Sequence, residues 1–372
     1  MKKLLFIFGT RPEAIKLAPL IRYCEGHNEQ FEVRICVTAQ HREMLDDVLK
    51  FFSIEPHYDL NLMRPNQTLF DITIDGLQGL KGALEDCQPH SIVIQGDTTT
   101  AFVGALAGFY TRTSVSHIEA GLRSGDKYSP YPEEMNRILA GHLADFHFAP
   151  TDLAAQNLGR EGITKNVWVV GNTVIDALFL GLSIIDATQV ERFLRHFEYI
   201  DFSKNIVLIT CHRRESFGKP LENIFLAIRE LADRYANLEF VYPVHLNPNV
   251  QEPAMRILGR CGNVHLVKPL SYAQLIWIMS KSHFILTDSG GIQEEAPSLG
   301  KPVLVMRDVT ERREGIDAGT ARLVGTRREV IVTEASRLLE DEDCYQMMAR
   351  AINPYGDGKA CARIAEIWAE RL

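Results

Sequence analysis

Short runs of apolar residues alternate with amphipathic segments along almost the whole chain, and this pattern constrains the fold more than any other feature of the sequence. The runs are apolar throughout rather than at every second residue, which is typical of parallel strands that helices cover on both faces. The sequence therefore predicts an α/β fold of two doubly wound, Rossmann-like domains. The predicted strands fall into two successive sets, residues 4–8, 33–38, 91–95, 114–118, 146–149 and 167–169, and then residues 206–210, 239–242, 264–267, 283–287, 303–306 and 321–324.

The length of the chain agrees with two domains, because 372 residues are more than a single hydrophobic core usually supports. We place the first domain at residues 1–170 and the second at residues 171–358, with the boundary close to Gly171. A last helix is predicted over residues 359–372, after the sequence PYGDG. Since no strand follows that helix, we expect it to cross back and to pack Trp368 on the first domain.

Charge and cysteine content exclude several classes of function. A net charge of −8 disfavours binding along a nucleic-acid backbone. The 7 cysteines include no C-x-x-C pair, so buried thiols in a reducing compartment are a simpler interpretation than disulfides or a zinc ribbon. The apolar run at the N-terminus is interrupted by Arg11 and Pro12, unlike a signal peptide, and no later run reaches the length of a membrane helix. We expect a cytoplasmic protein that binds neither nucleic acid nor membranes.

Polar residues follow the apolar runs in both halves of the chain. In a doubly wound sheet such positions gather at the carboxyl ends of the strands, where ligands bind. We expect the two domains to face one another across a central cleft and to build one site from both sets. The residues concerned are 9–13, 97–100 and 119–123 in the first half, and 212–214, His245 and the turn after Thr287 in the second.

The sequence FILTDSGGIQEEAP, residues 284–297, predicts a phosphate site. A buried strand runs into Ser289, Gly290 and Gly291, whose backbone can turn sharply and bring N–H groups close to an anion. The helix predicted next would direct its positive end to the same place, and Glu295 is placed to accept hydrogen bonds from ribose hydroxyls. A nucleoside diphosphate fits this arrangement. An ordinary connection from strand to helix remains the alternative interpretation.

Three carboxylates, Asp97, Glu119 and Glu133, are predicted beside the cleft in the first domain. A cluster of acids near a nucleotide sugar suits removal and donation of protons, provided that burial or like-charge repulsion keeps one acid protonated. Metal binding is the competing chemistry. We rank it lower because no D-x-D element with hydroxyl neighbours is present.

Cations accompany these acids in the sequence. Arg11 and Lys16 lie on one predicted helix and are placed to meet a phosphate or a carboxylate. Glu133 and Arg137 lie four residues apart on one face of another helix. Taken alone, these charges are explained as well by a capped helix and by a surface ion pair worth about 0.5 kcal/mol.

Several segments taken together resemble one family, the non-hydrolysing UDP-N-acetylglucosamine 2-epimerases. The match extends in order from the first predicted strand to about Gly358. The resemblance implies a GT-B-type fold and reversible conversion of UDP-N-acetylglucosamine to UDP-N-acetylmannosamine without nicotinamide or metal. It also implies elimination of UDP to a bound 2-acetamidoglucal and re-addition after protonation at C2 from the other face. The segments are GTRPEAIK (9–16), GDTTT (96–100), HIEAGLR (117–123), PEEMNR (132–137), GNTVID (171–176), HRRESFG (212–218) and TDSGGIQEEAPSLG (287–300).

The resemblance also assigns a role to each side chain. Asp97 and Glu119 match the acid and base at C2, with the face that each serves left open, and Glu133 is held by Arg137 and tunes them. Lys16, Arg137 and His212 complete the catalytic set. The residues that match contacts to UDP are Arg11, Lys16 and His212 as cations and donors, Ser289, Gly290 and Gly291 at the phosphates, Glu295 at the ribose and Arg312 at the nucleotide.

Bacterial members of this family are associated with activation by their own substrate at a second pocket. The resemblance places Gln40, His41, Arg213 and His245 in that pocket, and a helix N-terminal residue without a ligand is the alternative interpretation of His41. It also implies a homodimer. An epimerase for a related UDP-acetamido sugar, a hydrolysing epimerase and a GT-B-type glycosyltransferase are the competing functions.

The chain departs from the family pattern at a few positions. Gln95, Cys211 and Arg313 stand where histidine, glycine and proline are common. A change at residue 95 alters a polar contact near Asp97, and a side chain at residue 211 lies where the backbone approaches phosphate. None of these departures removes a predicted catalytic group.

Overall fold

The computed structural model describes residues 1–38, 42–64 and 66–372, and the chain divides into two compact units. Unit 1 comprises Met1–Leu180 and Tyr355–Leu372, and unit 2 comprises Gly181–Pro354. The division falls within a helix, α7, rather than at Gly171. The reason is that the first half of this helix packs in unit 1, where Val174, Ile175 and Leu178 are buried.

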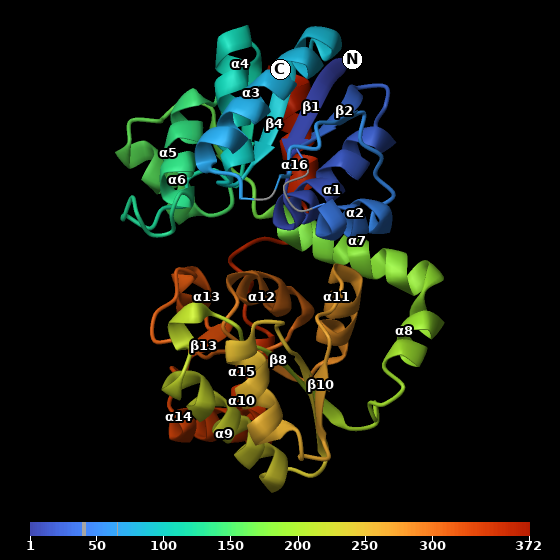
Figure 1. Ribbon diagram of the computed structural model, residues 1–372, viewed down its shortest axis with the longest axis vertical. Coiled ribbons are helices and arrows are strands. Elements are labelled where there is room, and N and C mark those ends of the chain that lie inside the picture. The colour runs from blue at the N-terminus through green and yellow to red at the C-terminus, as the bar shows by residue number, and fades with distance from the viewer. Residues whose placement is uncertain (39–41, 65) are drawn as a thin grey trace. The chain divides into compact units, whose positions relative to one another are not determined.

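Unit 1 is a doubly wound parallel sheet with the strand order β3-β2-β1-β4-β5-β6-β7 (Figure 1). Helices α1, α2 and α16 pack together on one face, and α3, α4 and α5 pack together on the other. The elements are β1 (Lys2–Phe8), α1 (Arg11–Gly26), β2 (Phe31–Val37), α2 (Arg42–Phe51), β3 (Tyr58–Asp59), α3 (Leu69–Cys87), β4 (Ser91–Gln95), α4 (Thr99–Thr111), β5 (Ser114–Ile118), α5 (Glu133–Leu143), β6 (Phe146–Ala149), α6 (Asp152–Arg160), β7 (Val167–Val169), α7 (Thr173–Thr188) and α16 (Ala360–Arg371).

The central strands of unit 1 are apolar on both sides because both sides are covered. Along β1, Leu5 and Ile7 belong to the core beneath α3 and α4, whereas Phe6 contacts the Trp368 ring on the opposite face. All residues from Leu4 to Phe8 are fully buried. The strand β3 was not predicted, since it is only two residues long and pairs Tyr58 with Cys36 at the edge of the sheet.

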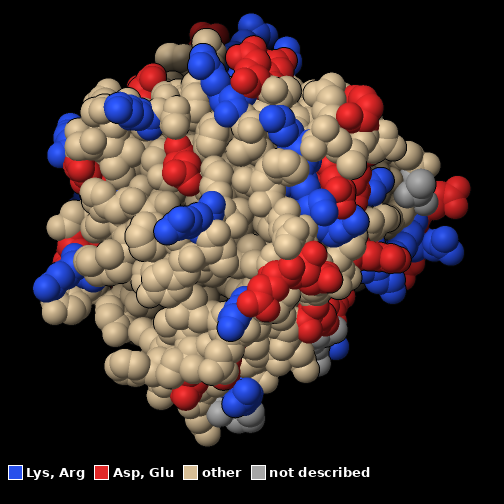
Figure 2. Space-filling model, turned by 90° about the horizontal axis from the view of Figure 1, so that it is seen from above, with Lys and Arg blue, Asp and Glu red and all other residues tan. Residues whose placement is uncertain are grey.

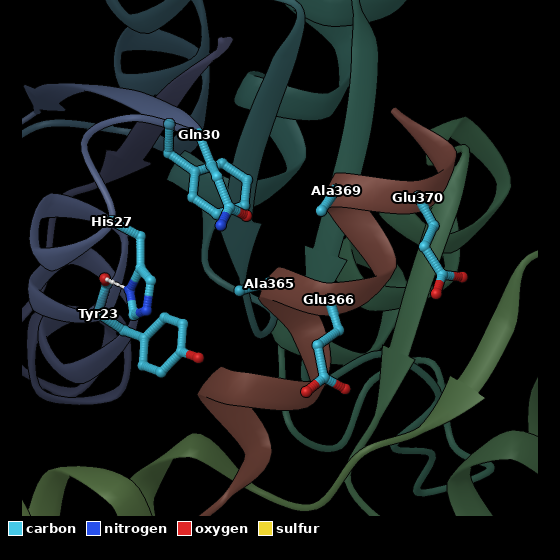
Figure 3. A pocket seen from close by; sticks show the side chains of 8 residues that line it. Tyr23, His27, Gln30, Ala365, Glu366, Ala369 and Glu370 are labelled. Atoms are coloured by element: carbon cyan, nitrogen blue, oxygen red, sulfur yellow. Dashed lines mark hydrogen bonds between the residues drawn. The ribbon is translucent and has the colours of Figure 1, made fainter.

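Helix α16 lies in unit 1, far from its neighbours in sequence. The Trp368 side chain is fully buried, with Phe6, Phe31 and Phe148 edge-on to its ring, and its indole N–H donates to Ser116 Oγ (2.9 Å). A groove of about 250 Å³ lies beside this helix. Glu366 and Glu370 line it together with the stacked rings of Tyr23 and His27 (Figure 3).

Unit 2 repeats the doubly wound plan with the strand order β10-β9-β8-β11-β12-β13, all parallel. The elements are α8 (Val190–His196), β8 (Asn205–Thr210), η1 (Arg214–Ser216), α9 (Lys219–Arg234), β9 (Leu238–Pro243), α10 (Pro248–Leu258), β10 (Val264–Val267), α11 (Tyr272–Lys281), β11 (Phe284–Thr287), α12 (Gly290–Glu295), η2 (Ala296–Leu299), β12 (Val303–Val305), α13 (Arg313–Asp317), β13 (Ala321–Leu323), α14 (Arg328–Glu340) and α15 (Glu342–Ala349).

The core of unit 2 lies on both sides of its sheet. One cluster joins β8 and β9 to α9, α10 and α14. Elsewhere in the unit, the buried Trp277 ring of α11 stacks on Phe193 and Phe197. In the described parts of the chain no single helix is both long and apolar enough to cross a membrane, and one bent pair, α7 with α8, meets that criterion by length and composition only.

Candidate active site

In unit 1 the direction of winding changes between β1 and β4, and the candidate site begins at the carboxyl ends of these strands. Doubly wound sheets bind ligands at such switch points. Gly9 follows β1 in very close contact with its neighbours: a Cβ there would lie 2.0 Å from Thr38 Oγ1 and 2.8 Å from Thr100 Oγ1. A side chain at residue 9 would therefore displace the turn from the strand ends that carry the predicted acids.

Glu13 connects the turn after β1 to the turn after β4. Its Oε2 accepts hydrogen bonds from Gly9 N (3.1 Å) and Thr10 N (2.8 Å), and its Oε1 accepts one from Thr98 Oγ1 (2.7 Å). The side chain is buried, and burial raises the pKa of Glu13 although the hydrogen bonds act to lower it. Because Thr98 follows Asp97 directly, Glu13 fixes the backbone beside the predicted acid.

Glu119 lies at the end of β5 with its carboxylate turned toward the same switch point. Lys16 of α1, the helix that Arg11 begins, donates to Glu119 Oε1 at 2.5 Å. A Cβ on Gly96 would lie 3.5 Å from Glu119 Oε2, so the carboxylate lies beside the turn that carries Asp97. Glu119 has a φ of 64°, a left-handed backbone that is uncommon for a residue with a side chain. The fold thus brings two of the predicted acids and Lys16 together.

Asp97 pairs with Arg137 of α5, and Asn136 Nδ2 donates to the Asp97 carbonyl (3.0 Å). The predicted pairing of Glu133 with Arg137 is wrong. The described partners of Arg137 are Asp97 and Glu134, whose Oε2 lies 3.3 Å from Arg137 Nη1. Helical spacing allows Arg137 to reach either glutamate. Glu134 is the one turned inward, at 1% exposure, whereas Glu133 begins the helix at its partly exposed end.

Two amide side chains that hold Glu119 were not predicted as site residues. Gln95 Nε2 donates to Glu119 Oε2 at 2.5 Å, and Asn172 Nδ2 donates to Glu119 Oε1 at 2.9 Å. Both amides are buried. Their signal in the sequence is weak, because neutral amides are common in turns and only their places, at the end of β4 and after β7, point to the site.

In unit 2 the corresponding switch point lies between β8 and β11. Asp288 follows β11, is fully buried, and accepts hydrogen bonds on Oδ2 from the backbone N–H groups of His212 (2.6 Å) and Arg213 (2.8 Å). Arg213 Nε in turn donates to the Asp288 carbonyl (3.0 Å). The aspartate of the SGG segment therefore joins the two turns and presents His212, whose side chain is 46% exposed.

The SGG turn leads into α12, which begins at Gly290 with Ser289 as its N-cap. Glu295 is nearly buried, and its Oε1 accepts a hydrogen bond from Tyr272 Oη (3.1 Å). Arg312 pairs with Glu294, the neighbouring carboxylate. The predicted UDP contacts of unit 2 thus lie on α12 and on a loop that is fixed to it.

Glu311 organises the charges next to Gly290. It pairs with Arg213 (3.0 Å) and with Arg307 (2.7 Å), and a Cβ on Gly290 would lie 3.2 Å from Glu311 Oε1. Burial alone would raise the pKa of Glu311, but a backbone hydrogen bond and the two guanidiniums outweigh burial and lower it to about 2. The carboxylate is ionised at any pH at which the protein is handled.

A separate pocket of about 380 Å³ lies beside this network in unit 2. His212, Arg213 and His245 line it, and the rings of His212 and His245 stack with their centroids 5.4 Å apart. Burial and the neighbouring His212 lower the pKa of His245. Of the residues predicted for a second pocket, Arg213 and His245 lie together here, while Gln40 and His41 lie outside the described residues.

His117, two residues before Glu119, makes the stability of unit 1 depend on pH. Burial lowers its pKa to about 4, although Nε2–H donates to the Gly96 carbonyl (2.7 Å). In the unfolded chain the pKa is about 6.5, so between pH 6.5 and 4 the unfolded state binds more protons than the folded state. Above pH 6.5 His117 is neutral in both states and does not destabilise the fold. As the pH falls from 6.5 to 4, its protonation in the unfolded state should lower the free energy of unfolding by about 3 kcal/mol.

Urea unfolding at pH 7, 6 and 5 should show this loss in the wild type and a flatter dependence in His117→Gln, which keeps a donor for Gly96. Burial of Glu13 acts with the opposite sign, because a raised carboxyl pKa favours the folded state at low pH. The difference between the two proteins therefore isolates His117. Equal slopes would contradict the prediction.

The two units, with polar residues gathered at the switch points of both sheets, define a GT-B-type protein built from Rossmann-like domains. The comparisons with known proteins agree with this fold class. Sucrose-phosphate synthase from Thermosynechococcus elongatus is 12% identical and superimposes with a TM-score of 0.63 over 99% of this chain and 99% of that chain. At this identity the likeness concerns the fold alone.

More similar proteins identify the family. The family model described as UDP-N-acetylglucosamine 2-epimerase matches residues 24–369. UDP-N-acetylglucosamine 2-epimerase from Escherichia coli K12 is 55% identical over 370 residues, 98% of this chain and 97% of the relative. The crystal structure of UDP-GlcNAc 2-epimerase from Neisseria meningitidis bound to UDP-GlcNAc is 49% identical, with a TM-score of 0.90 over 99% of this chain and 100% of that chain. The chain belongs to the UDP-N-acetylglucosamine 2-epimerase family.

Proposed function

We propose that the protein interconverts UDP-N-acetylglucosamine and UDP-N-acetylmannosamine. The observation that carries the proposal is the pair of carboxylates at one switch point, Asp97 with Arg137 and Glu119 with Lys16. Inversion at C2 needs one group to take the proton from one face and another to return a proton to the other face. Two acids, each with its own cation and in different contacts, meet that need.

The C2 proton of the sugar is barely acidic, because no carbonyl adjoins C2. Cleavage of the bond from C1 to the UDP oxygen therefore runs ahead and leaves positive charge on the ring, which the two carboxylates stabilise. One carboxylate then takes the C2 proton, and the electron pair of the C2–H bond forms the double bond of the 2-acetamidoglucal. In the return step a proton adds to C2 from the other face, and the departed UDP oxygen bonds again to C1.

UDP must stay bound while it is detached from the sugar. We assign its phosphates to the N–H groups of Ser289, Gly290 and Gly291 and to His212, its ribose to Glu295, and its nucleotide part to Arg312. The support is geometric, since Asp288 draws the turn that carries His212 to the SGG turn. Arg11 and Lys16 on α1 supply positive charge for the leaving diphosphate.

Incubation with UDP-N-acetylglucosamine in deuterated water tests the proposal. Proton NMR should show UDP-N-acetylmannosamine, with deuterium at C2 of both sugars at equilibrium. Free N-acetylmannosamine would instead indicate a hydrolysing enzyme. Turnover only in the presence of an acceptor would indicate a glycosyltransferase.

Activation by substrate is proposed for the unit 2 pocket beside Arg213 and His245. The cationic and imidazole groups there suit a second nucleotide diphosphate. Rates with UDP-N-acetylmannosamine alone should then show a lag that UDP-N-acetylglucosamine removes. Hyperbolic rates without a lag would contradict this.

The buried thiols favour a cytoplasmic setting.

A homodimer is proposed through the α4 apolar surface, which we define as Phe109 and Tyr110 at the end of α4. These side chains are 62% and 67% exposed, and their ring centroids lie 6.2 Å apart. Figure 2, which shows the protein from above, has wide areas without Lys, Arg, Asp or Glu. Exposed apolar area of this kind marks contact surfaces, and a second copy would bury it.

The variant Phe109→Glu should shift the protein from dimer to monomer in sedimentation velocity, because it places a charge in the buried centre of the contact. The matched control is Ile352→Glu, which changes an 87% exposed apolar side chain outside the α4 apolar surface. The control should stay dimeric. An unchanged sedimentation coefficient for Phe109→Glu would place the contact elsewhere.

A further inference from the structure

The proposed function gives Glu119 a reacting carboxylate but gives no role to the amides that hold it. Lys16 and Asn172 both donate to Oε1, and Gln95 donates to Oε2. The carboxylate is 5% exposed and its backbone is in the left-handed region, where a non-glycine residue persists only if its surroundings fix it. The orientation of Glu119 is therefore set by its partners rather than by its own conformational preference.

Asn172 is the partner with the most demanding set of contacts. Its Nδ2 donates to Glu119, its Oδ1 accepts from Val174 N (3.1 Å), and its backbone N–H donates to the Tyr355 carbonyl (2.7 Å). The residue is 3% exposed. Acceptance from residue i+2 is a turn that Asp and Ser also form. Donation to Glu119 at the same time requires an amide at this position.

The backbone around Asn172 lies just before α7, the helix within which the chain leaves unit 1, and it contacts the segment where the chain returns. Gly171, at φ +93°, passes so near the returning segment that a Cβ on it would lie 3.4 Å from Gly356 Cα. Asp176 on α7 accepts hydrogen bonds from the N–H groups of Ala360 (3.3 Å) and Cys361 (2.9 Å), the first residues of α16. The start of α7 and the returning segment are thus held together within unit 1.

We propose that Asn172 is a positioning residue, which orients the Glu119 carboxylate and links that orientation to the segment where the chain returns to unit 1. This rests on the proposed function, in which Glu119 exchanges a proton with C2. The side chain of Asn172 acts through Glu119 and is not itself a reacting group. A change in the contact between residues 172 and 355 alters the donor at Glu119 Oε1.

Two variants that both keep the turn to Val174 test the proposal. Asn172→Ser removes the donor to Glu119, and kcat should fall roughly tenfold to a hundredfold with KM within about threefold. Asn172→Asp replaces the donor by a carboxylate. The acid limb of the kcat profile should then move at least about one pH unit higher, because neighbouring carboxylates resist ionising together. Among the described residues, Lys16 pairs with Glu119, and the titratable ring of His117 interacts with it at longer range.

A readout that needs no turnover is the pH titration of the Glu119 carboxyl carbon in protein labelled with ¹³C-glutamate, assigned with Glu119→Gln. The titration should move to higher pH in Asn172→Asp. The control is Asn157→Asp on α6, a similar substitution whose amide donates to the Gly121 carbonyl rather than to a carboxylate. It should leave the titration and the kcat profile unchanged.

The outcomes separate this proposal from the proposed function. A wild type that does not epimerise would refute the function while the ¹³C titration still tests Asn172. If the pH profile of kcat and the ¹³C titration of Glu119 were the same in Asn172→Ser as in Asn172→Asp, the positioning role would be overturned. If Asn172→Asp does not fold, Asn172→Ser decides alone: an unchanged kcat, or a loss matched by the Asn157→Asp control, would refute the proposal.

Discussion

Substitution of Asp97 by Asn should abolish deuterium exchange at C2 and lower kcat by about three orders of magnitude or more, while UDP still binds. General acid and base groups contribute about 10²–10⁴ each, and Asn keeps the shape of the side chain but can neither accept nor return the proton. The amide also removes one of the two carboxylates that Arg137 pairs with and leaves Glu134 as the other. NMR in deuterated water measures exchange, and calorimetric titration measures UDP binding.

The matched control for Asp97→Asn is Asp145→Asn. Asp145 also lies in unit 1, but its Oδ2 accepts from Val115 N (2.9 Å) at the start of β5, at the opposite end of the strand from Glu119. It should keep full activity at a cost in stability of about 1 kcal/mol. Retained exchange in Asp97→Asn would remove Asp97 from the mechanism, and loss of UDP binding would show that its role is in binding the nucleotide.

The fold could be predicted from the sequence because both sheets are parallel and covered. The residues Leu4–Phe8 of β1 are all fully buried, so they appear as an unbroken apolar run that can be recognised without knowledge of the neighbouring strands. The edge strand Tyr58–Asp59 carries no such run and was missed. The division within α7 was missed as well, because a helix that continues from one unit into the next has no break in its sequence pattern.

The candidate site could be predicted only in part. Asp97, Glu119 and Lys16 meet because they follow strands and helices that adjoin at one switch point, which the order of elements determines. The partner of Arg137 on α5 depends on which glutamate the tertiary packing turns inward. Helical spacing does not decide this, because glutamates three and four residues before Arg137 can both reach it. Asn172 was missed because its contact with Glu119 joins residues 53 positions apart in the sequence.

The last residues of the chain belong to unit 1, where they contact the surroundings of the candidate site. Residues after Tyr355 complete the core of unit 1, and the same segment contacts Asn172 beside Glu119. The returning chain therefore contributes both to the stability of unit 1 and to the surroundings of a predicted acid. These two contributions can be separated, since Trp368 lies on the side of α16 that faces the sheet, where it contacts Phe6, Phe31, Phe148 and Ser116.

Replacement of Trp368 by Ala should lower the free energy of unfolding of unit 1 by about 4 kcal/mol. The side chain is fully buried among three aromatic rings, and truncation of such a residue to Ala costs about 3–5 kcal/mol in lost contacts and cavity formation. Ser116 Oγ loses the indole donor but keeps its contact with Ser91 Oγ (3.0 Å), so this hydroxyl still has a partner. Hydrogen exchange measured by segment should be faster in the variant than in the wild type, and this increase should be larger in β1 and α16 than in β8 and β11.

Two controls locate the effect of Trp368→Ala. Trp368→Phe keeps an aromatic ring against Phe6 and Phe148 and should cost only about 1–2 kcal/mol. Trp277→Ala removes an equally buried ring from unit 2 and should speed exchange in that unit instead. If Trp368→Ala left β1 as protected as in the wild type, or destabilised both units equally, α16 would not be the element that completes the core of unit 1.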